Sequence, residues 1–255
     1  MKKDKEQVQK EINKVWENEW RHASKNGAKL LFNQRLFVEG YPIFRKYIPK
    51  NAKTILDVGG GTGRYGVKMA KDFPNAKVYV TDIVPESLEI ARVLAQEVNA
   101  TNLEFYTEDV NALSFPSNFF DLVFCDVVIQ HLPDVEHAMR EMSRVCKQGG
   151  VLIVSANNLW NPHTVYKFFM GKHYHYGYEK SYTRKELHDL FVAHHLEVIS
   201  IDGFYPAYFL YRLRGVYRNL GKLLNRLNRN VDPWTGRFLS RHFGFEIFCV
   251  ARKPK

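Results

Sequence analysis

Cysteine and long apolar segments are both scarce in this sequence. The 255 residues include three cysteines, Cys125, Cys146 and Cys249, and none has the CxxC spacing typical of metal and redox sites. Cys125 and Cys249 lie in apolar runs, so we expect buried, reduced thiols. No run of about 18 apolar residues occurs, which argues against a membrane-spanning helix. Residues 1–16 are strongly charged and lack the apolar stretch of a signal peptide, so we expect a cytoplasmic protein.

Acidic residues are in the minority, and one long segment has none. Lysine and arginine number 37 against 27 aspartates and glutamates, which gives a net charge of +10. Residues 203–231 contain six basic residues and no acidic one. This balance favours anionic surroundings, such as nucleic acid, an anionic membrane surface or a phosphorylated acceptor, and does not choose among them.

Apolar runs of strand length alternate with segments of helical pattern. We predict strands over 55–58, 78–81, 103–106, 121–125, 151–155, 196–201 and 245–251. We predict helices over 7–24, 30–47, 85–98, 133–146 and 183–194, and a further helix that follows the first strand and ends near residue 73. Strands separated by helices indicate an α/β fold, in which a mostly parallel sheet has helices on both faces.

Four glycines cluster after the first predicted strand, in Gly59-Gly60-Gly61-Thr62-Gly63. Glycine lets the chain turn sharply and lets a ligand approach the main chain, with its polar end over the N–H groups at the helix start. The spacing Gly61-x-Gly63-x-x-Gly66, with Asp82 about twenty positions on, fits a dinucleotide site and an S-adenosylmethionine site equally well.

Further acidic positions favour S-adenosylmethionine. Asp57 lies two residues before the first glycine, where a carboxylate would attract a cationic amino-acid group and repel a pyrophosphate. Asp109 follows the third strand, where it could accept a hydrogen bond from the adenine amino group. The fourth strand ends in Cys125-Asp126, directly before residues 128–134.

Together these segments resemble the class I methyltransferases, and among them the group of ubiquinone and menaquinone biosynthesis methylases. The resemblance covers residues 50–160, with a weaker match over 245–251, and it rests on Asp57-x-Gly59-x-Gly61-x-Gly63, Asp82, Asp109, the strand 120–126 with its Gln130-His131-Leu132 continuation, and residues 148–153. It implies a Rossmann-like three-layer sandwich whose mostly parallel, seven-stranded sheet has an antiparallel last strand. It also implies S-adenosyl-L-methionine as cofactor and S-adenosyl-L-homocysteine as product.

The same resemblance assigns the cofactor contacts. Gly59, Gly61 and Gly63 would face the methionine end of the cofactor, and Asp57 would bind its ammonium group directly or through water. Asp82 would hold the two ribose hydroxyls, and Asp109 with the N–H of Val110 would bind adenine. Ile83 and Asp126 complete the predicted cofactor site.

The segments outside the sheet are expected to cover the acceptor. We expect the helices of residues 1–50 to form an acceptor-side cap on a methyltransferase domain spanning 51–255. Residues 157–182 are rich in aromatic residues and histidine without clear periodicity, and about forty residues separate the last two strands. We therefore expect cap insertions at about 157–182 and 203–243.

The acceptor atom is expected to be oxygen or carbon. Amino-methylating branches of the family often carry an Asn/Asp-Pro-Pro-aromatic motif after the fourth strand, where this chain has Cys125-Asp126-Val127-Val128. His131 is the candidate catalytic base, because it follows the strand that ends at the reaction centre; a structural histidine is the alternative.

Acceptor contacts are predicted at five positions. The predicted set is Gln130, His131, Trp20, Tyr176 and Tyr205. The segment 163–178 is interpreted as an acceptor lid, with a surface loop or a metal site using His173 and His175 as alternatives. We assign no metal.

Residues 205–229 have the pattern of an amphipathic helix, with Arg214, Arg218, Lys222 and Arg226 opposite an apolar face. The helix would roof the core, rest on an anionic membrane that supplies a lipid-like acceptor, or bind RNA, although no RNA-binding motif supports the last. The leading hypothesis is a methyltransferase acting on a small-molecule or lipid-like acceptor. An RNA or protein methyltransferase and a non-catalytic binding module are the alternatives.

Overall fold

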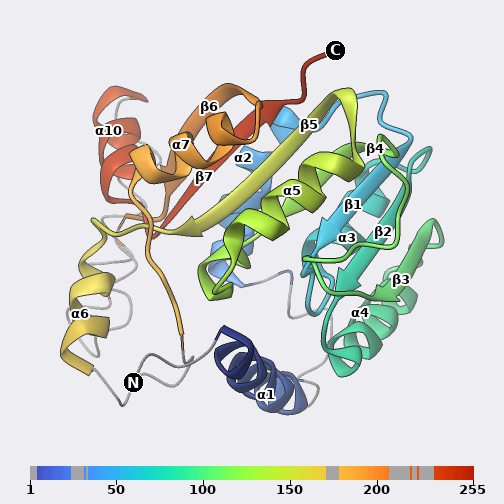
Figure 1. Ribbon diagram of the computed structural model, residues 1–255, viewed down its shortest axis with the longest axis horizontal. Helices are drawn as coiled ribbons and strands as arrows, with labels where there is room; N and C mark the ends of the chain where they lie inside the picture. The colour runs from blue at the N-terminus through green and yellow to red at the C-terminus, as the bar shows by residue number, and fades with distance from the viewer. Residues whose placement is uncertain are drawn as a thin grey trace.

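A seven-stranded sheet forms the centre of the molecule (Figure 1). The computed structural model describes residues 5–23, 32, 34–170, 178–206, 219, 223 and 233–255. The strands are β1 (Thr54–Val58), β2 (Lys77–Asp82), β3 (Leu103–Thr107), β4 (Phe120–Cys125), β5 (Cys146–Asn157), β6 (Glu197–Phe204) and β7 (Glu246–Arg252). Their order is β3-β2-β1-β4-β5-β7-β6; β1 to β5 run parallel, and β7 is antiparallel to both β5 and β6. The predicted Rossmann-like fold is confirmed.

Helices cover both faces of this sheet. They are α1 (Lys5–Ala23), α2 (Arg35–Phe44), α3 (Arg64–Asp72), α4 (Pro85–Glu97), α5 (Val135–Val145), α6 (Pro162–Met170), α7 (Arg184–Ala193) and α10 (Pro233–Phe243), with short 3₁₀ turns η3 (Arg45–Tyr47) and η4 (Ile129–His131). Two local signals set helix starts: Pro85 opens α4, and Thr183 and Glu186 form a capping box at the start of α7.

The buried strands carry apolar residues on both sides because helices cover both faces of the sheet. Alternate residues of each strand point to opposite faces. On one face, Leu56, Val123 and Leu152 join a core cluster that includes Met142 of α5 and Phe191 of α7. On the other face, Ile55, Leu122 and Ile153 join a cluster that includes Phe44 of α2 and Met69 of α3. The sheet is therefore fixed between two helical layers, and the ends of its strands are held in place.

Three segments differ from the prediction. β5 begins at Cys146, five residues earlier than predicted and directly after α5 ends at Val145; Gly149, with a φ of +75°, lies inside this strand. α6 lies within 157–182, which was expected to be irregular, and α10 lies within 203–243. α6 is nine residues long, so its periodicity is too short to stand out against aromatic side chains on all sides.

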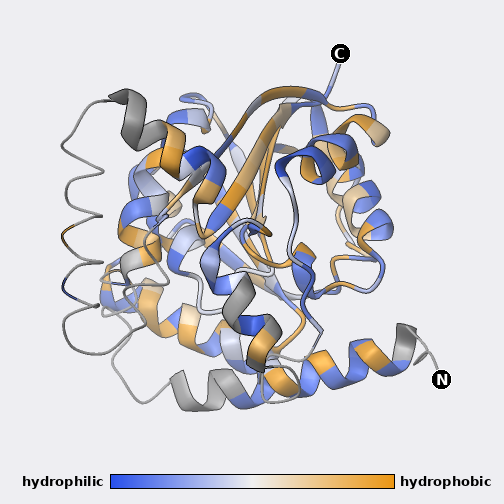
Figure 2. Ribbon diagram, turned by 90° about the vertical axis from the view of Figure 1, so that its left-hand side faces the viewer, coloured by the Kyte–Doolittle hydropathy of each residue, from blue (hydrophilic) through white to orange (hydrophobic). Residues whose placement is uncertain are grey.

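The predicted helix over 205–229 lies almost entirely outside the described residues. Figure 2 shows polar and apolar residues alternating along α1, which lies against the rest of the molecule. None of the described helices is long and apolar enough to cross a membrane.

Candidate functional site

A cavity of about 360 Å³ opens at the carboxyl ends of the parallel strands. This is where ligands bind in open α/β sheets, next to the point where the strand order reverses between β1 and β4. We call its two sides the β1–β3 half and the β4–β7 half. The β1–β3 half includes Asp57, Gly59, Gly61, Asp82, Ile83, Asp109 and Val110. The β4–β7 half includes Asp126, Gln130, His131, Asn157, His163, Glu179, Phe245 and Glu246. Gln9, Ile12, Asn13 and Trp16 of α1 also line the cavity.

The glycine-rich turn forms the base of the β1–β3 half. Gly59 has a φ of +61° and Gly61 a φ of +53°, a region of backbone conformation that L side chains rarely adopt. A Cβ on Gly59 would lie 2.5 Å from Val128 Cγ2, so a larger residue would push apart the segments after β1 and β4. Gly63 begins α3 and packs against Ala91 of α4; it is not among the residues that line the cavity.

Asp57 connects the end of β1 to the first turn of α3, directly after the glycine-rich turn. Its side chain is 1% exposed, and its Oδ2 accepts a hydrogen bond from the N–H of Gly66 at 2.8 Å. Burial raises the pKa of Asp57 to about 8, against the hydrogen bond from Gly66, which lowers it. A cationic ligand group in the cavity would stabilise the ionised form.

Asp82 connects the end of β2 to the glycine-rich turn. Its Oδ2 accepts from the N–H of Gly61 at 2.8 Å, and its Oδ1 accepts from the N–H of Val84 at 2.9 Å. Burial raises the pKa of this carboxyl, and the backbone hydrogen bonds oppose the rise. Each oxygen retains a further lone pair, so the carboxylate can still receive the two hydroxyls of a ribose.

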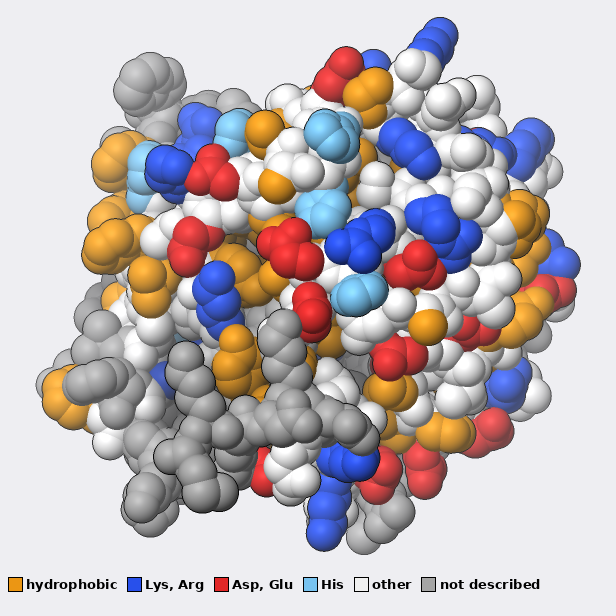
Figure 3. All heavy atoms as spheres, viewed as in Figure 1, with side chains coloured by type: hydrophobic (Ala, Val, Ile, Leu, Met, Phe, Trp, Pro, Cys, Tyr) orange, Lys and Arg blue, Asp and Glu red, His pale blue; other side chains and the backbone are white. Residues whose placement is uncertain are grey.

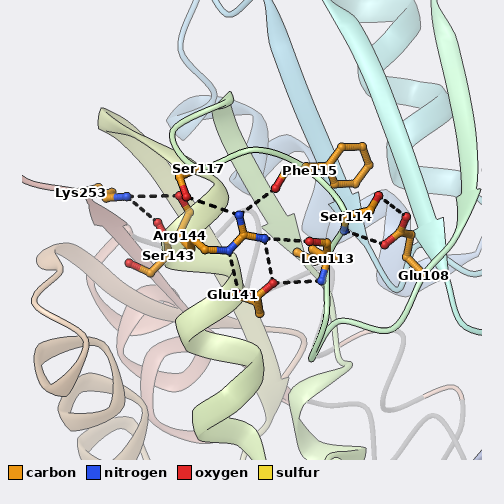
Figure 4. Close-up of polar contacts among 9 residues, drawn as sticks. All are labelled: Glu108, Leu113, Ser114, Phe115, Ser117, Glu141, Ser143, Arg144 and Lys253. Carbon is orange, nitrogen blue, oxygen red and sulfur yellow. Dashed lines mark hydrogen bonds and ion pairs between the residues drawn. The ribbon is translucent and has the colours of Figure 1, made fainter.

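The segment after β3 is fastened to α5 (Figure 4). Asp109 Oδ1 accepts from the backbone and side-chain nitrogens of Asn111. Glu141 accepts from the N–H of Leu113 at 3.0 Å, and Arg144 donates to the carbonyl oxygens of Leu113 and Phe115, both at 2.8 Å. The Glu141–Arg144 pair therefore sets the path of the chain that follows Asp109 and Val110.

Asp126 lies at the end of β4 beside a partly buried cation, Arg64, that the sequence interpretation missed. Ser155 donates to Asp126 Oδ1 at 2.6 Å, and a guanidinium nitrogen of Arg64 lies 3.5 Å from Asp126 Oδ2. Arg64 lines the cavity and occupies a variable position of the G-x-G-x-x-G pattern. Its partner is 62 positions away in sequence, so no local signal could have identified it.

His131 is 4% exposed and both ring nitrogens are engaged. Nδ1 lies 3.2 Å from the carbonyl oxygen of Tyr178, which can only accept, so Nδ1 carries the hydrogen. Nε2 then accepts from the Gln130 amide at 3.3 Å, and Gln130 Oε1 accepts from the N–H of Asn157. Burial lowers the pKa of His131, so the ring is neutral near pH 7. The lone pair on Nε2 is therefore already used in a hydrogen bond, which weakens the interpretation of His131 as a general base.

The other predicted acceptor contacts have different outcomes. Gln130 and His131 line the cavity. Tyr205 does not: it is 1% exposed and belongs to the same core cluster as Ile55 and Leu122, so its expected contact with the acceptor is not supported. The side chain of Trp20, and Tyr176, lie outside the described residues, as do His173 and His175.

Two further side chains close the β4–β7 half. Glu179 is 3% exposed and forms an ion pair with Lys167 of α6, and it also accepts from the side-chain amide of Asn157. This contact joins α6 to the segment around 178–182 beside the cavity. In the part of the chain that the structure describes, no group of three or more His, Cys, Asp or Glu residues is arranged to hold a metal ion.

Fold and cavity together have the architecture of an S-adenosylmethionine-binding methyltransferase. The sequence model of the methyltransferase domain family matches residues 49–193, more than half of the chain. The protein therefore belongs to the class I S-adenosylmethionine-dependent methyltransferases, and the predicted family is confirmed.

Known relatives match over part of their length. The ubiquinone/menaquinone biosynthesis C-methyltransferase UbiE of Hahella chejuensis is 36% identical over 103 residues, 40% of this chain and 41% of the relative. The uncharacterized methyltransferase YcgJ of Bacillus subtilis is 30% identical over 131 residues, half of each chain. The chain thus spans about half the length, or less, of these curated relatives.

A solved structure agrees in fold. Geranyl diphosphate C-methyltransferase from Streptomyces coelicolor, in complex with Mg²⁺, geranyl diphosphate and S-adenosyl-L-homocysteine, superposes with a TM-score of 0.61 at 14% identity. The superposition covers 84% of this chain and 78% of that one.

Proposed function

We propose that the protein transfers the methyl group of S-adenosylmethionine to an oxygen or carbon atom of a small-molecule or lipid-like acceptor. The observation that carries the proposal is the meeting of Asp57, the glycine-rich turn, Asp82 and Asp109 in one cavity, which continues past Asp126 into a second half. The names of UbiE and of the geranyl diphosphate enzyme, both C-methyltransferases, support a small-molecule acceptor.

The residues of the β1–β3 half fit the cofactor chemically. Asp57 would attract the ammonium group, Asp82 would accept from the ribose hydroxyls, and Asp109 with the N–H of Val110 would bind adenine. Gly59 leaves no Cβ between the ligand and the main chain. Arg64 is a cation at the same wall and suits the methionine carboxylate.

The cofactor supplies an activated methyl group on sulfur, so the protein needs to align the acceptor and exclude water. Trp16 and His131 close the cavity on the side of α1, and the Lys167–Glu179 pair holds α6 at the edge of the cavity.

Methylation of RNA or protein is the second candidate function, because only the net charge of the chain supports it.

A lipid-like acceptor is supported by apolar side chains on the surface. Trp160 is 64% exposed and Phe169 is 80% exposed, at the start and end of the α6 region, and Phe238 of α10 is 55% exposed. Figure 3 shows hydrophobic side chains gathered over α10. An exposed apolar surface of this kind, in a chain whose residues 203–231 are basic in sequence, suits peripheral contact with an anionic membrane.

Calorimetry tests the core of the proposal. S-adenosylhomocysteine should bind with one-to-one stoichiometry and NADH should not bind. Binding of NADH, or no binding of S-adenosylhomocysteine, would exclude the proposed cofactor.

A further inference from the structure

Glu246 forms a pair of buried carboxyl groups with Asp126 in the β4–β7 half. Glu246 is 1% exposed and begins β7, opposite Asn157 of β5 in the sheet. Asp126 follows β4 and is 9% exposed. Both line the cavity. Asp126 follows β4 in the middle of the sequence and Glu246 begins the last strand, and both reach the cavity because β7 inserts beside β5.

Both carboxyl groups have raised pKa values. Burial raises the pKa of Glu246 well above its ordinary value, and the charge of Asp126 and a hydrogen bond with that carboxyl act in the same direction. Burial also raises the pKa of Asp126, against the opposing effects of Arg64 and Ser155. Two adjacent buried carboxyl groups do not both ionise, because like charges repel strongly in a site of low dielectric. Asp126, which has the cationic neighbour, therefore holds the negative charge, and Glu246 holds the proton.

Glu246 also has unused hydrogen-bonding capacity. Its Oε2 is buried and receives no hydrogen bond from the described chain. Nearby polar groups already have partners: Gln130 with His131, and Asn157 with Glu179. A buried oxygen without a donor is costly, so a ligand that supplies a donor at this position gains affinity.

The local charges favour a neutral donor. Arg64, the Asp126 carboxylate and protonated Glu246 sum to a net charge of zero. An ammonium group would enter uncompensated, beside the sulfonium that the proposed function places in the same cavity. A hydroxyl can donate to Glu246 Oε2 and remain neutral.

The walls around the pair are aromatic. The rings of Trp16 and His131 have centroids 5.0 Å apart, and those of His163 and Phe245 are 5.3 Å apart. Flat rings of this kind favour contact with another flat ring.

We propose that Glu246 and Asp126 form the acceptor subsite, which binds the hydroxyl group of an aromatic acceptor and takes its proton. This inference rests on the proposed function. In the step, the acceptor O–H bond breaks and its proton passes to Glu246 Oε2, while the oxygen forms a bond to the methyl carbon. The carbon–sulfur bond breaks and leaves its electron pair on sulfur. The proton that Glu246 shared moves to Asp126, so the pair loses one negative charge as the sulfonium loses its positive charge.

The test uses the whole chain, S-[methyl-³H]adenosylmethionine and a library of one- and two-ring phenols, each with its methyl ether and its aniline counterpart. Tritium should enter products from phenols and not from the ethers or anilines. Glu246→Gln should lower kcat for the labelled phenols by about 10²- to 10⁴-fold, the usual cost of losing a general base. Glu246→Asp, which keeps the carboxyl group, should recover part of this loss. Glu197→Gln on the exposed start of β6 is the matched control and should behave as wild type.

Binding of S-adenosylhomocysteine separates this inference from the proposed function. Glu246→Gln should keep the wild-type affinity within about twofold, which also shows that the variant is folded. A loss of affinity of about tenfold, equivalent to about 1.4 kcal/mol, would mean that Glu246 contacts the cofactor and would overturn the inference. Labelled anilines, a Glu246→Gln variant with wild-type turnover, or a wild type that labels no phenol would also overturn it. A wild type that does not bind S-adenosylhomocysteine would overturn the proposed function instead.

Discussion

The indole of Trp16 meets the imidazole of His131 edge to face, with ring centroids 5.0 Å apart and planes at 79°. Trp16 belongs to α1 and His131 to η4, more than a hundred positions apart in the sequence. The contact makes the N-terminal helix one wall of the cavity, next to the segment that follows β4. The predicted acceptor contact on α1 is Trp20; Trp16 lies one helical turn earlier on the same helix.

Trp16 and His131 should contribute to binding of the acceptor. Because both nitrogens of His131 are engaged and its ring is neutral, His131→Ala should raise the acceptor KM and lower kcat less than a lost general base would. Steady-state kinetics with a phenol labelled in the library assay measures both parameters. A kcat lowered by about 10²-fold or more with KM unchanged would restore His131 as the base.

Asp82 should control cofactor affinity. Asp82→Ala leaves the N–H groups of Gly61 and Val84 without their acceptors, and we expect S-adenosylhomocysteine binding to weaken by about 1–3 kcal/mol. Calorimetry of wild type and variant measures the difference. Asp189→Ala on the exposed side of α7 is the control. Equal affinities in wild type and Asp82→Ala would contradict the assignment.

Asp57 should make stability depend on pH. Its pKa is raised from 3.8 to about 8 in the folded protein, so the folded state binds this proton more tightly than the unfolded chain. The resulting contribution to the free energy of unfolding is complete below the unfolded pKa and is lost as pH rises through about 8. Between about pH 5 and pH 9 the free energy of unfolding of the wild type should fall by a few kcal/mol more than that of Asp57→Asn. Urea denaturation at each pH measures this difference. Parallel pH profiles for the two proteins would show that Asp57 ionises normally.

Arg144 should affect cofactor affinity from outside the cavity. Arg144→Ala removes the donors to the carbonyl groups of Leu113 and Phe115, so the segment after Asp109 and Val110 loses its attachment to α5. We expect S-adenosylhomocysteine to bind several-fold more weakly, and discrimination against S-inosylhomocysteine, which lacks the adenine amino group, to shrink. Arg140→Ala, one turn earlier on the exposed face of α5, should have neither effect. Retained discrimination in Arg144→Ala would limit Arg144 to a role in stability.

The basic residues of 205–229 should mediate membrane contact. The protein should sediment with vesicles that contain anionic lipid and be released by salt, because exposed charges are screened within about a Debye length. Replacing Arg214, Arg218, Lys222 and Arg226 with glutamine should abolish sedimentation and leave cofactor affinity unchanged. Equal binding to neutral vesicles would argue against the electrostatic part of the proposal.

The β1–β3 half could be predicted because its signals are local. Asp57, Gly59 and Asp82 each lie at the end of a strand with a clear apolar pattern, and parallel strands bring those ends together at one edge. The β4–β7 half depends on contacts between distant segments. Arg64 meets Asp126, and Asp126 meets Glu246, only once β4, β5 and β7 are placed side by side.

The direction of Tyr205, a predicted acceptor contact, also depends on features outside the sequence pattern. Tyr205 follows β6 with a φ of +59°. That conformation is uncommon for a side chain as large as tyrosine, and Tyr205 belongs to the core cluster that also includes Phe245. No pattern of residue types reveals such a turn.

The position of β7 has a consequence for the order in which the enzyme can be assembled during synthesis. The ribosome produces β1 to β4 first, and these strands are neighbours in the sheet, so they can pair before the rest of the chain is made. β7 is translated after the six other strands of the described sheet, yet it lies between β5 and β6, and β6 has no other neighbour among those strands. The nascent chain can therefore complete the side of the cavity that holds Asp57 and Asp82 well before Glu246 arrives. A chain truncated before β7 would keep the means to bind a methyl donor and lack the strand that completes the opposite wall.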